Sequence, residues 1–170
     1  MAVAFLGLGS NLADKKNNII RAIGKIGDIS GLRIKAVSSL YSGSALGVTN
    51  QPDFANAVIK IETSLDPHSL LKTMQAIEIT LGKHPHSHNE PRLIDIDILL
   101  YDDVIMDSLE LMIPHSRLLK RRFVLEPLVE IESELKEPET GVALKSYLNV
   151  VKSQDLEIIA DAKTLWPKSE

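Results

Sequence analysis

The chain has 170 residues, of which 44% are hydrophobic and 25% are charged, and its formal net charge at pH 7 is −4. These values are typical of a globular protein with a substantial core, so we expect a single domain over residues 1–170. The modest negative charge argues against nucleic acid as a partner, and the absence of cysteine excludes disulfides and thiolate metal sites. The apolar N-terminal run lacks the positive start of a signal peptide, and no stretch is long enough to span a membrane. We therefore expect a cytoplasmic monomer without a membrane partner.

Hydrophobic periodicity predicts six elements before residue 102. They are a strand at 3–8, a helix at 12–26, a strand at 32–41, a strand at 54–63, a helix at 67–81 and a strand at 93–101. Asp66 offers an N-cap for the second helix, with Pro67 at its first position and Gly82 at its end. The order β-α-β-β-α-β is typical of an α+β ferredoxin-like sandwich, in which helices cover one face of an antiparallel sheet.

The rest of the chain adds smaller elements. Residues 101–114 have the pattern of a short hairpin, and residues 115–131 are helical with a break expected at Pro127. From Pro138 onward we expect a short helix and a weakly patterned tail, so the fold should carry additional C-terminal helices. The sequence "GLGSNL" follows the first strand, but Leu12 stands in place of the last glycine of a dinucleotide fingerprint and no parallel βαβ unit follows. We reject that interpretation.

Two aspartates interrupt the otherwise apolar strand at 93–101. Because side chains alternate along a strand, Asp95 and Asp97 should share one face of the sheet with Leu93 and Leu99. The other face should carry Ile94, Ile96, Ile98 and Leu100. Two residues that share a face are roughly 6.6 Å apart along the backbone. At an effective dielectric constant of about 20, the repulsion between two such carboxylates is on the order of 2.5 kcal/mol.

A positive partner should offset this repulsion. Mg²⁺ suits the site, because it takes carboxylate oxygens and completes its shell with water and phosphate. Two ions about 3.5–4 Å apart could share the pair of aspartates. Arg92 could also help, although its strand parity places it on the opposite face. The alternative is that both aspartates only solvate an exposed sheet face beside nearby lysines.

Three stretches occur in a specific order, "NQPDFAN" at 50–56, "PRLIDIDIL" at 91–99 and "PHSRLLKRRFVLEPL" at 114–128. Together with "GLGSNL", they resemble the 6-hydroxymethyl-7,8-dihydropterin pyrophosphokinases of folate biosynthesis. The similarity runs from about residue 3 to about residue 135, and the family's ferredoxin-like fold agrees with the element order. The resemblance implies an enzyme that transfers the β,γ-pyrophosphoryl group of ATP to the hydroxymethyl oxygen of the pterin and releases AMP.

The resemblance also implies which residues act. Asp95 and Asp97 match the ligands of two Mg²⁺ ions and, together with Arg92, the catalytic positions. The positions that contact ATP correspond to Gln75, Glu78, Lys83, Arg92, Ile98, His115, Ser116 and Arg121. The pterin is expected between the rings of Phe54 and Phe123, next to Asn56 and the loop residues Gly43, Ser44, Ala45 and Leu46. Two aromatic rings and an amide suit a flat heterocycle with donors and acceptors along its edge.

The loop "KHPHSHNE", residues 83–90, departs most from the family. Lys83 stands where the family has an arginine, and His88, Asn89 and Glu90 stand where the family usually has an arginine, a tryptophan and a glycine. Because this loop closes over ATP in the family, we expect altered closure and an altered affinity for the nucleotide.

Alternative interpretations remain at this stage. His84, His86 and His88 alternate and could bind Zn²⁺ or Ni²⁺, although the flanking polar residues favour a solvated loop. The chain could also be a noncatalytic module that binds a nucleotide or a pterin, or a metal-dependent phosphohydrolase that uses the same aspartates. The noncatalytic module does not need both aspartates, and the phosphohydrolase does not need Phe54, Phe123 and Asn56.

Overall fold

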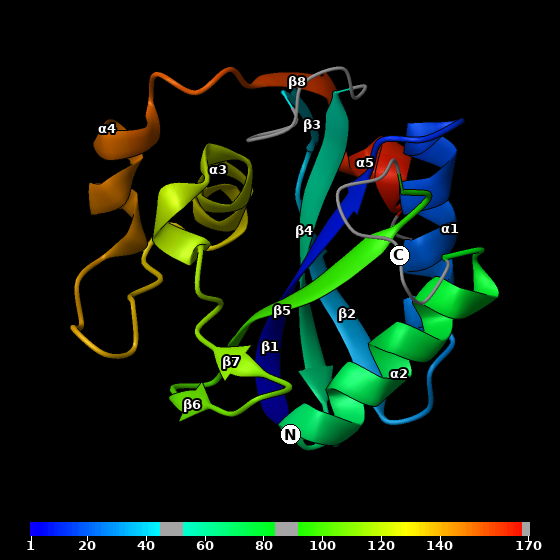
Figure 1. The fold of residues 1–170 in the computed structure, drawn as a ribbon, viewed down its shortest axis with the longest axis horizontal. Coiled ribbons are helices and arrows are strands. Elements are labelled where there is room, and N and C mark those ends of the chain that lie inside the picture. The colour runs from blue at the N-terminus through cyan, green and yellow to red at the C-terminus, as the bar shows by residue number, and fades with distance from the viewer. Residues whose placement is uncertain (45–52, 84–91, 168–170) are drawn as a thin grey trace.

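A six-stranded antiparallel sheet forms the centre of the molecule (Figure 1). The computed structural model describes residues 1–44, 53–83 and 92–167. The strands are β1 (Ala2–Ser10), β2 (Leu32–Val37), β3 (Leu40–Gly43), β4 (Phe54–Thr63), β5 (Asp95–Tyr101) and β8 (Glu157–Ala160). Their order across the sheet is β5-β1-β4-β3-β8, and β2 also pairs with β4. With β2 and β3 taken as one interrupted strand, the first four strands and two helices follow the expected β-α-β-β-α-β order.

Two helices cover one face of this sheet. They are α1 (Lys15–Gly27) and α2 (Pro67–Thr80), and they lie together on the right of Figure 1. Asp66 caps α2 as expected, because its side chain accepts a hydrogen bond from the backbone N–H of Ser69 while Pro67 opens the helix. Fully buried side chains such as Leu6, Ile23 and Ile59 fill the layer between these helices and the sheet.

A third helix covers part of the opposite face. Helix α3 (Arg122–Ile131) follows a short 3₁₀ turn, η1 (Leu118–Lys120), and packs against β4. The buried residues Phe5, Val58, Leu99 and Leu125 belong to the core on this side. Helix α3 lies over only one end of the sheet (Figure 1).

The strand expected at 32–41 is interrupted. Ser38 belongs to neither strand, but its N–H donates to the Val58 carbonyl and its hydroxyl accepts from the Val58 N–H, each at 2.9 Å. Glu130 on α3 then accepts hydrogen bonds from the backbone N–H and the hydroxyl of Ser39 and from the hydroxyl of Tyr41. These contacts join β3 to α3, and they could not be inferred from the local pattern.

The helix expected at 115–131 begins only at Arg122 and continues through Pro127 to Ile131, so the expected break is wrong. Proline removes one backbone donor, but this residue lies one turn into a helix that is packed on the sheet, where tertiary contacts decide the outcome. The expected hairpin is present as β6 (Met106–Asp107) and β7 (Met112–Ile113).

The C-terminal part of the chain is more ordered than its pattern indicates. It contains η2 (Leu144–Tyr147), α4 (Leu148–Val151), β8 and α5 (Ala162–Leu165). Strand β8 extends the main sheet beyond β3, and Trp166 lies against Gly27 at the end of α1. No helix in the described part of the chain is both long and apolar enough to cross a membrane.

A bulge in β5 corrects one expected face assignment. Leu6 pairs with Ile98 and Phe5 pairs with Leu100, so Leu99 has no partner on β1. The extra residue shifts the alternation, and Leu100 therefore joins the α3-side core with Leu99 instead of the helix-side core with Ile96.

Candidate functional site

Six residues of three adjacent strands form what we call the ligand face, the part of the sheet beyond α3. Gly7 of β1 pairs with Asp97 on one side and with Val58 on the other. Gly9 pairs with Asp95 and with Asn56. The six residues are Asp95 and Asp97 on β5, Gly7 and Gly9 on β1, and Phe54 and Asn56 on β4. Two carboxylates are thus separated from an aromatic ring and an amide by a strip of backbone without side chains.

Asp95 already has a cation on each of its two oxygens. Lys83 Nζ is 2.9 Å from Asp95 Oδ1, and Arg92 Nη1 donates to Asp95 Oδ2 at 2.7 Å. The expectation that Arg92 points to the opposite face is wrong, because Arg92 lies before the strand and strand parity does not apply to it. The Arg92 Nε is buried and has no hydrogen-bond partner within the described ranges.

Neighbouring residues fix these cations in place. Asn11, which is buried, donates its backbone N–H to the Arg92 carbonyl at 3.0 Å and accepts from the Arg92 N–H at 2.7 Å. Glu78 on α2 accepts from Lys83 Nζ at 3.0 Å and from the Ile96 N–H at 2.8 Å. Burial raises the pKa of the Glu78 carboxyl, against the lowering effect of these two partners. Burial lowers the pKa of Lys83, but its hydrogen bond and charge contact with Asp95 outweigh this effect and leave the pKa raised.

Asp97 lies near a second group of basic side chains. Desolvation by the surrounding protein raises the pKa of the Asp97 carboxyl, and His115 and Arg121 oppose this rise. Burial lowers the pKa of His115; the negative charge of Asp97 opposes this effect, and the positive charges of Arg121 and Arg117 add to it. The His115 Nδ1 accepts from the Arg117 N–H at 3.1 Å, so the proton is on Nε2, where it can be donated to an anion.

The residues expected to hold a pterin lie partly together. Phe54 and Asn56 are on β4, and Asn56 is 5% exposed. Its side-chain nitrogen Nδ2 is buried and has no hydrogen-bond partner among the described residues. Phe123 lies in the first turn of α3, and the Arg121 guanidinium carbon lies 5.3 Å from the centre of its ring, a cation–π contact. A buried donor without a partner is costly, which favours a ligand at Asn56.

Other expected residues occupy different surroundings. Gln75 on α2 and Ser116 are exposed, and Ser44 follows β3. A Cβ atom at Gly43 would come within 3.0 Å of the Asp155 carbonyl, so the C-terminal segment packs against this position. The side chain of Ile98 is 3% exposed and lies in the helix-side core. That side chain lies on the face of β5 opposite Asp95 and Asp97, and the expected ATP contact of Ile98 stays a prediction.

Several expectations fall outside the described residues. These are the pterin contacts of Ala45 and Leu46, the metal alternative at His84, His86 and His88, and the altered closing loop apart from Lys83.

The basic run 120–122 separates into different roles. Arg122 donates to the backbone carbonyl of Gln154 at 2.8 Å and pairs with Glu126 at 3.2 Å, so it ties α3 to the C-terminal segment. Arg121 alone of the three is among the charges that act on Asp97.

Sequence reasoning missed three residues of this site, which are Gly7, Gly9 and Asn11. Glycine inside a strand marks a close approach of a ligand or another backbone, so the "GLG" of the first strand was an available signal. The role of Asn11 depends on a contact 81 positions along the chain, and no local pattern indicates it.

Gly9→Ala should weaken binding of the pterin about tenfold, because a misplaced recognition group loses much of its binding energy. A Cβ atom at residue 9 would lie 3.1 Å from the Asn56 Oδ1 and would push that amide. Equilibrium fluorescence titration with the pterin measures the effect. Gly24→Ala on α1 is the matched control, since an added Cβ there would meet nothing within 4 Å. Equal losses in both variants would contradict a specific role for Gly9.

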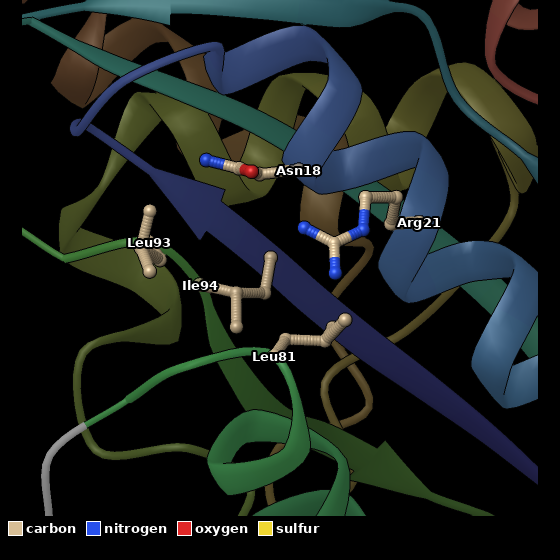
Figure 2. Close-up of a pocket in the computed structure, with 5 residues that line it drawn as sticks. All are labelled: Asn18, Arg21, Leu81, Leu93 and Ile94. Carbon is tan, nitrogen blue, oxygen red and sulfur yellow. The ribbon is translucent and has the colours of Figure 1, made fainter.

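A separate small pocket does not belong to this site. It is lined by Asn18 and Arg21 of α1 and by Leu81, Leu93 and Ile94, as Figure 2 shows. The space between these side chains does not admit a water molecule, so it offers no room for a substrate.

Comparison with known proteins supports the resemblance. The family described as 7,8-dihydro-6-hydroxymethylpterin-pyrophosphokinase matches residues 5–133. The chain is 40% identical over 153 residues to the folic acid synthesis protein fol1 of Pneumocystis carinii, which covers 90% of this chain and 20% of that protein. It is also 40% identical over 147 residues to the 2-amino-4-hydroxy-6-hydroxymethyldihydropteridine pyrophosphokinase of Aquifex aeolicus, with 86% of this chain and 91% of that protein covered.

Solved structures agree with the fold. The crystal structure of a Plasmodium falciparum HPPK-DHPS triple mutant with STZ-DHP has a TM-score of 0.69 and 17% sequence identity, and the match covers 88% of this chain and 43% of that chain. At this identity the likeness concerns the fold alone. The chain thus spans only a fifth of the length of the fungal relative and less than half of the Plasmodium chain, but nearly the whole of the Aquifex enzyme. The match over residues 5–133 and the identity to the Aquifex enzyme show that the chain belongs to the 7,8-dihydro-6-hydroxymethylpterin-pyrophosphokinase family.

Proposed function

We propose that the protein transfers pyrophosphate from ATP to the hydroxymethyl group of 6-hydroxymethyl-7,8-dihydropterin in a Mg²⁺-dependent reaction of folate biosynthesis. The products are the pterin diphosphate and AMP. The observation that carries the proposal is the pairing of Gly9 with both Asp95 and Asn56, which puts the expected metal ligand and the expected pterin-recognition amide on either side of one glycine.

The carboxylates suit Mg²⁺ in number and type. Within the described ranges, no group of three or more His, Cys, Asp or Glu residues is placed to hold a metal ion, so among these residues a metal at Asp95 and Asp97 would have two carboxylates as its protein ligands. Mg²⁺ is usually held by one or two carboxylates together with water and substrate phosphates. Asp95 and Asp97 would hold the metal, which would supply neutralisation of the phosphate charge.

The chain's own residues then orient the reactants. Phe54 and Phe123 would hold the two faces of the pterin, and the free Nδ2 of Asn56 would donate to its edge. Arg121 and the Nε2–H of His115 would contact phosphate oxygens near Asp97. The hydroxymethyl oxygen forms a bond to the β-phosphorus while the bond from that phosphorus to the α,β-bridging oxygen breaks. The hydroxyl proton is lost to solvent, and AMP leaves with the bridging oxygen.

This reaction needs correct positioning of the reactants and charge neutralisation more than a strong base.

The resemblance assigns Glu78 and Gln75 to ATP, but only one of the two side chains is free to contact it in the structure. Gln75 is exposed and available, whereas Glu78 is already bonded to Lys83 and the Ile96 N–H. We infer that Glu78 acts on the nucleotide through Lys83 and the position of β5.

The proposed activity predicts that AMP forms from ATP and Mg²⁺ only when 6-hydroxymethyl-7,8-dihydropterin is present. Separation of the nucleotides by chromatography measures AMP, ADP and phosphate together, and removal of Mg²⁺ with a chelator should stop the reaction. Pterin binding without AMP would instead support the noncatalytic module. Release of phosphate without the pterin would support the phosphohydrolase.

A further inference from the structure

Lys83 has two acidic partners in the structure. Its Nζ lies 2.9 Å from Asp95 Oδ1 and 3.0 Å from Glu78 Oε2. The Lys83 side chain is only 26% exposed, and those of Asp95 and Glu78 are 16% and 8% exposed. Such partly buried charge contacts are less screened by solvent than contacts on an open surface. The attraction between the Lys83 ammonium and the Asp95 carboxylate is therefore only weakly screened by solvent.

The charges of this group cancel. Lys83 and Arg92 carry two positive charges, and Glu78 and Asp95 carry two negative charges, with both Asp95 oxygens in contact with a cation. A divalent cation that approaches Asp95 meets this neutral group and competes with Lys83 and Arg92 for the Asp95 oxygens.

The two cations are not equally free to leave. The Arg92 backbone is held by two hydrogen bonds to Asn11, at 3.0 and 2.7 Å. Lys83 has Glu78 as a second partner, so it can release Asp95 and keep an ion pair. Its flexible side chain and compact charge also suit such a move better than a planar guanidinium does.

We propose that Lys83 is a resident counter-cation of Asp95 that keeps divalent metal off the ligand face in the absence of nucleotide. Metal binding then releases Lys83 from Asp95 while its contact with Glu78 remains, and the anionic phosphates of ATP favour the same release. The proposal rests on the proposed function, since it takes Asp95 as a metal ligand.

Binding of Mn²⁺ alone, followed by electron paramagnetic resonance of the free ion, tests the proposal without ATP or pterin. Wild-type protein should bind Mn²⁺ weakly, and Lys83→Met should bind it about tenfold more tightly or better, because one positive charge beside the liganding oxygen is gone. Lys83→Gln should behave in the same way, which guards against a packing defect in one variant. Lys83→Arg keeps the charge and should resemble wild type. Lys72→Met removes the same charge from an exposed position of α2 and should also resemble wild type.

Adding Asp97→Asn to Lys83→Met should cancel the gain in Mn²⁺ affinity, which places the ion at the two aspartates. The counter-cation role is overturned if neither uncharged variant binds Mn²⁺ more tightly than wild type, or if the gain survives Asp97→Asn. These outcomes are separate from the proposed function. Wild-type protein that forms AMP while the Lys83 variants bind Mn²⁺ unchanged would reject only the counter-cation. Tighter Mn²⁺ binding in protein that forms no AMP would reject only the enzymatic proposal.

Discussion

Asp97→Asn should lower kcat for AMP formation by about three orders of magnitude, which corresponds to about 4 kcal/mol of transition-state stabilisation. The change removes one negative charge and leaves the shape of the side chain almost unchanged. Asp97 is exposed, and Asp95 on the same face remains paired with Lys83 and Arg92. The fold should therefore be unaffected, and steady-state assay of AMP together with thermal unfolding separates the two effects.

Asp103→Asn provides the matched control for this variant. It makes the same chemical change at an exposed residue just beyond the end of β5, away from the ligand face. We expect kcat within about twofold of wild type there, as for most surface substitutions. Near-normal turnover in Asp97→Asn, or a fall in unfolding temperature large enough to explain lost activity, would remove the metal role from Asp97.

The sequence predicts the two helices and the inner strands because their signals are local. An Asp-Pro pair caps α2, and the alternation of side chains puts Asp95 and Asp97 on one face. Neither inference needs a contact from a distant part of the chain. The resemblance adds the order of the motifs, and it assigns Phe54, Asn56 and the aspartates to one site before any strand register is known.

What the sequence does not predict depends on register and on long-range contacts. The bulge at Leu99 reverses the face of Leu100, and nothing in an apolar run marks which residue is unpaired. The break between β2 and β3 depends on bonds from Ser39 and Tyr41 to Glu130, about 90 positions away. Strand β8 has two exposed isoleucines and few apolar contacts, so its pairing with β3 leaves little trace in the periodicity.

The same reason explains the cations around Asp95. Lys83 and Arg92 lie on either side of a segment outside the described residues, yet both contact one carboxylate. Strand parity assigns Arg92 to the wrong face because the chain is not yet a strand at that residue. The alternation of side chains along a strand therefore cannot be used for residues that lie just before the strand begins. Only the pairing of β1 with β5 shows that Gly7 and Gly9 lie next to the two aspartates.

Asn56→Leu should separate pterin recognition from stability. Leucine has nearly the shape of asparagine but no donor, so loss of hydrogen bonds to the pterin edge should raise the pterin KM about 100-fold, or about 2.7 kcal/mol. In the unliganded protein, the Asn56 Nδ2 is buried and has no partner among the described residues, and its loss removes a cost. The free energy of unfolding should consequently stay the same or rise by about 1–3 kcal/mol.

Two measurements on Asn56→Leu separate an effect on stability from an effect on pterin recognition. Denaturant unfolding reports the stability, and steady-state kinetics report KM for the pterin and for ATP separately. The KM for ATP should change by no more than about twofold, because Asn56 lies across β1 from the carboxylates and a residue acts chiefly on the substrate it contacts. An unchanged pterin KM would show that Asn56 does not recognise the pterin. A loss of stability would show instead that the amide has a structural partner, and the ligand face would then lose the feature that most directly indicates a bound heterocycle.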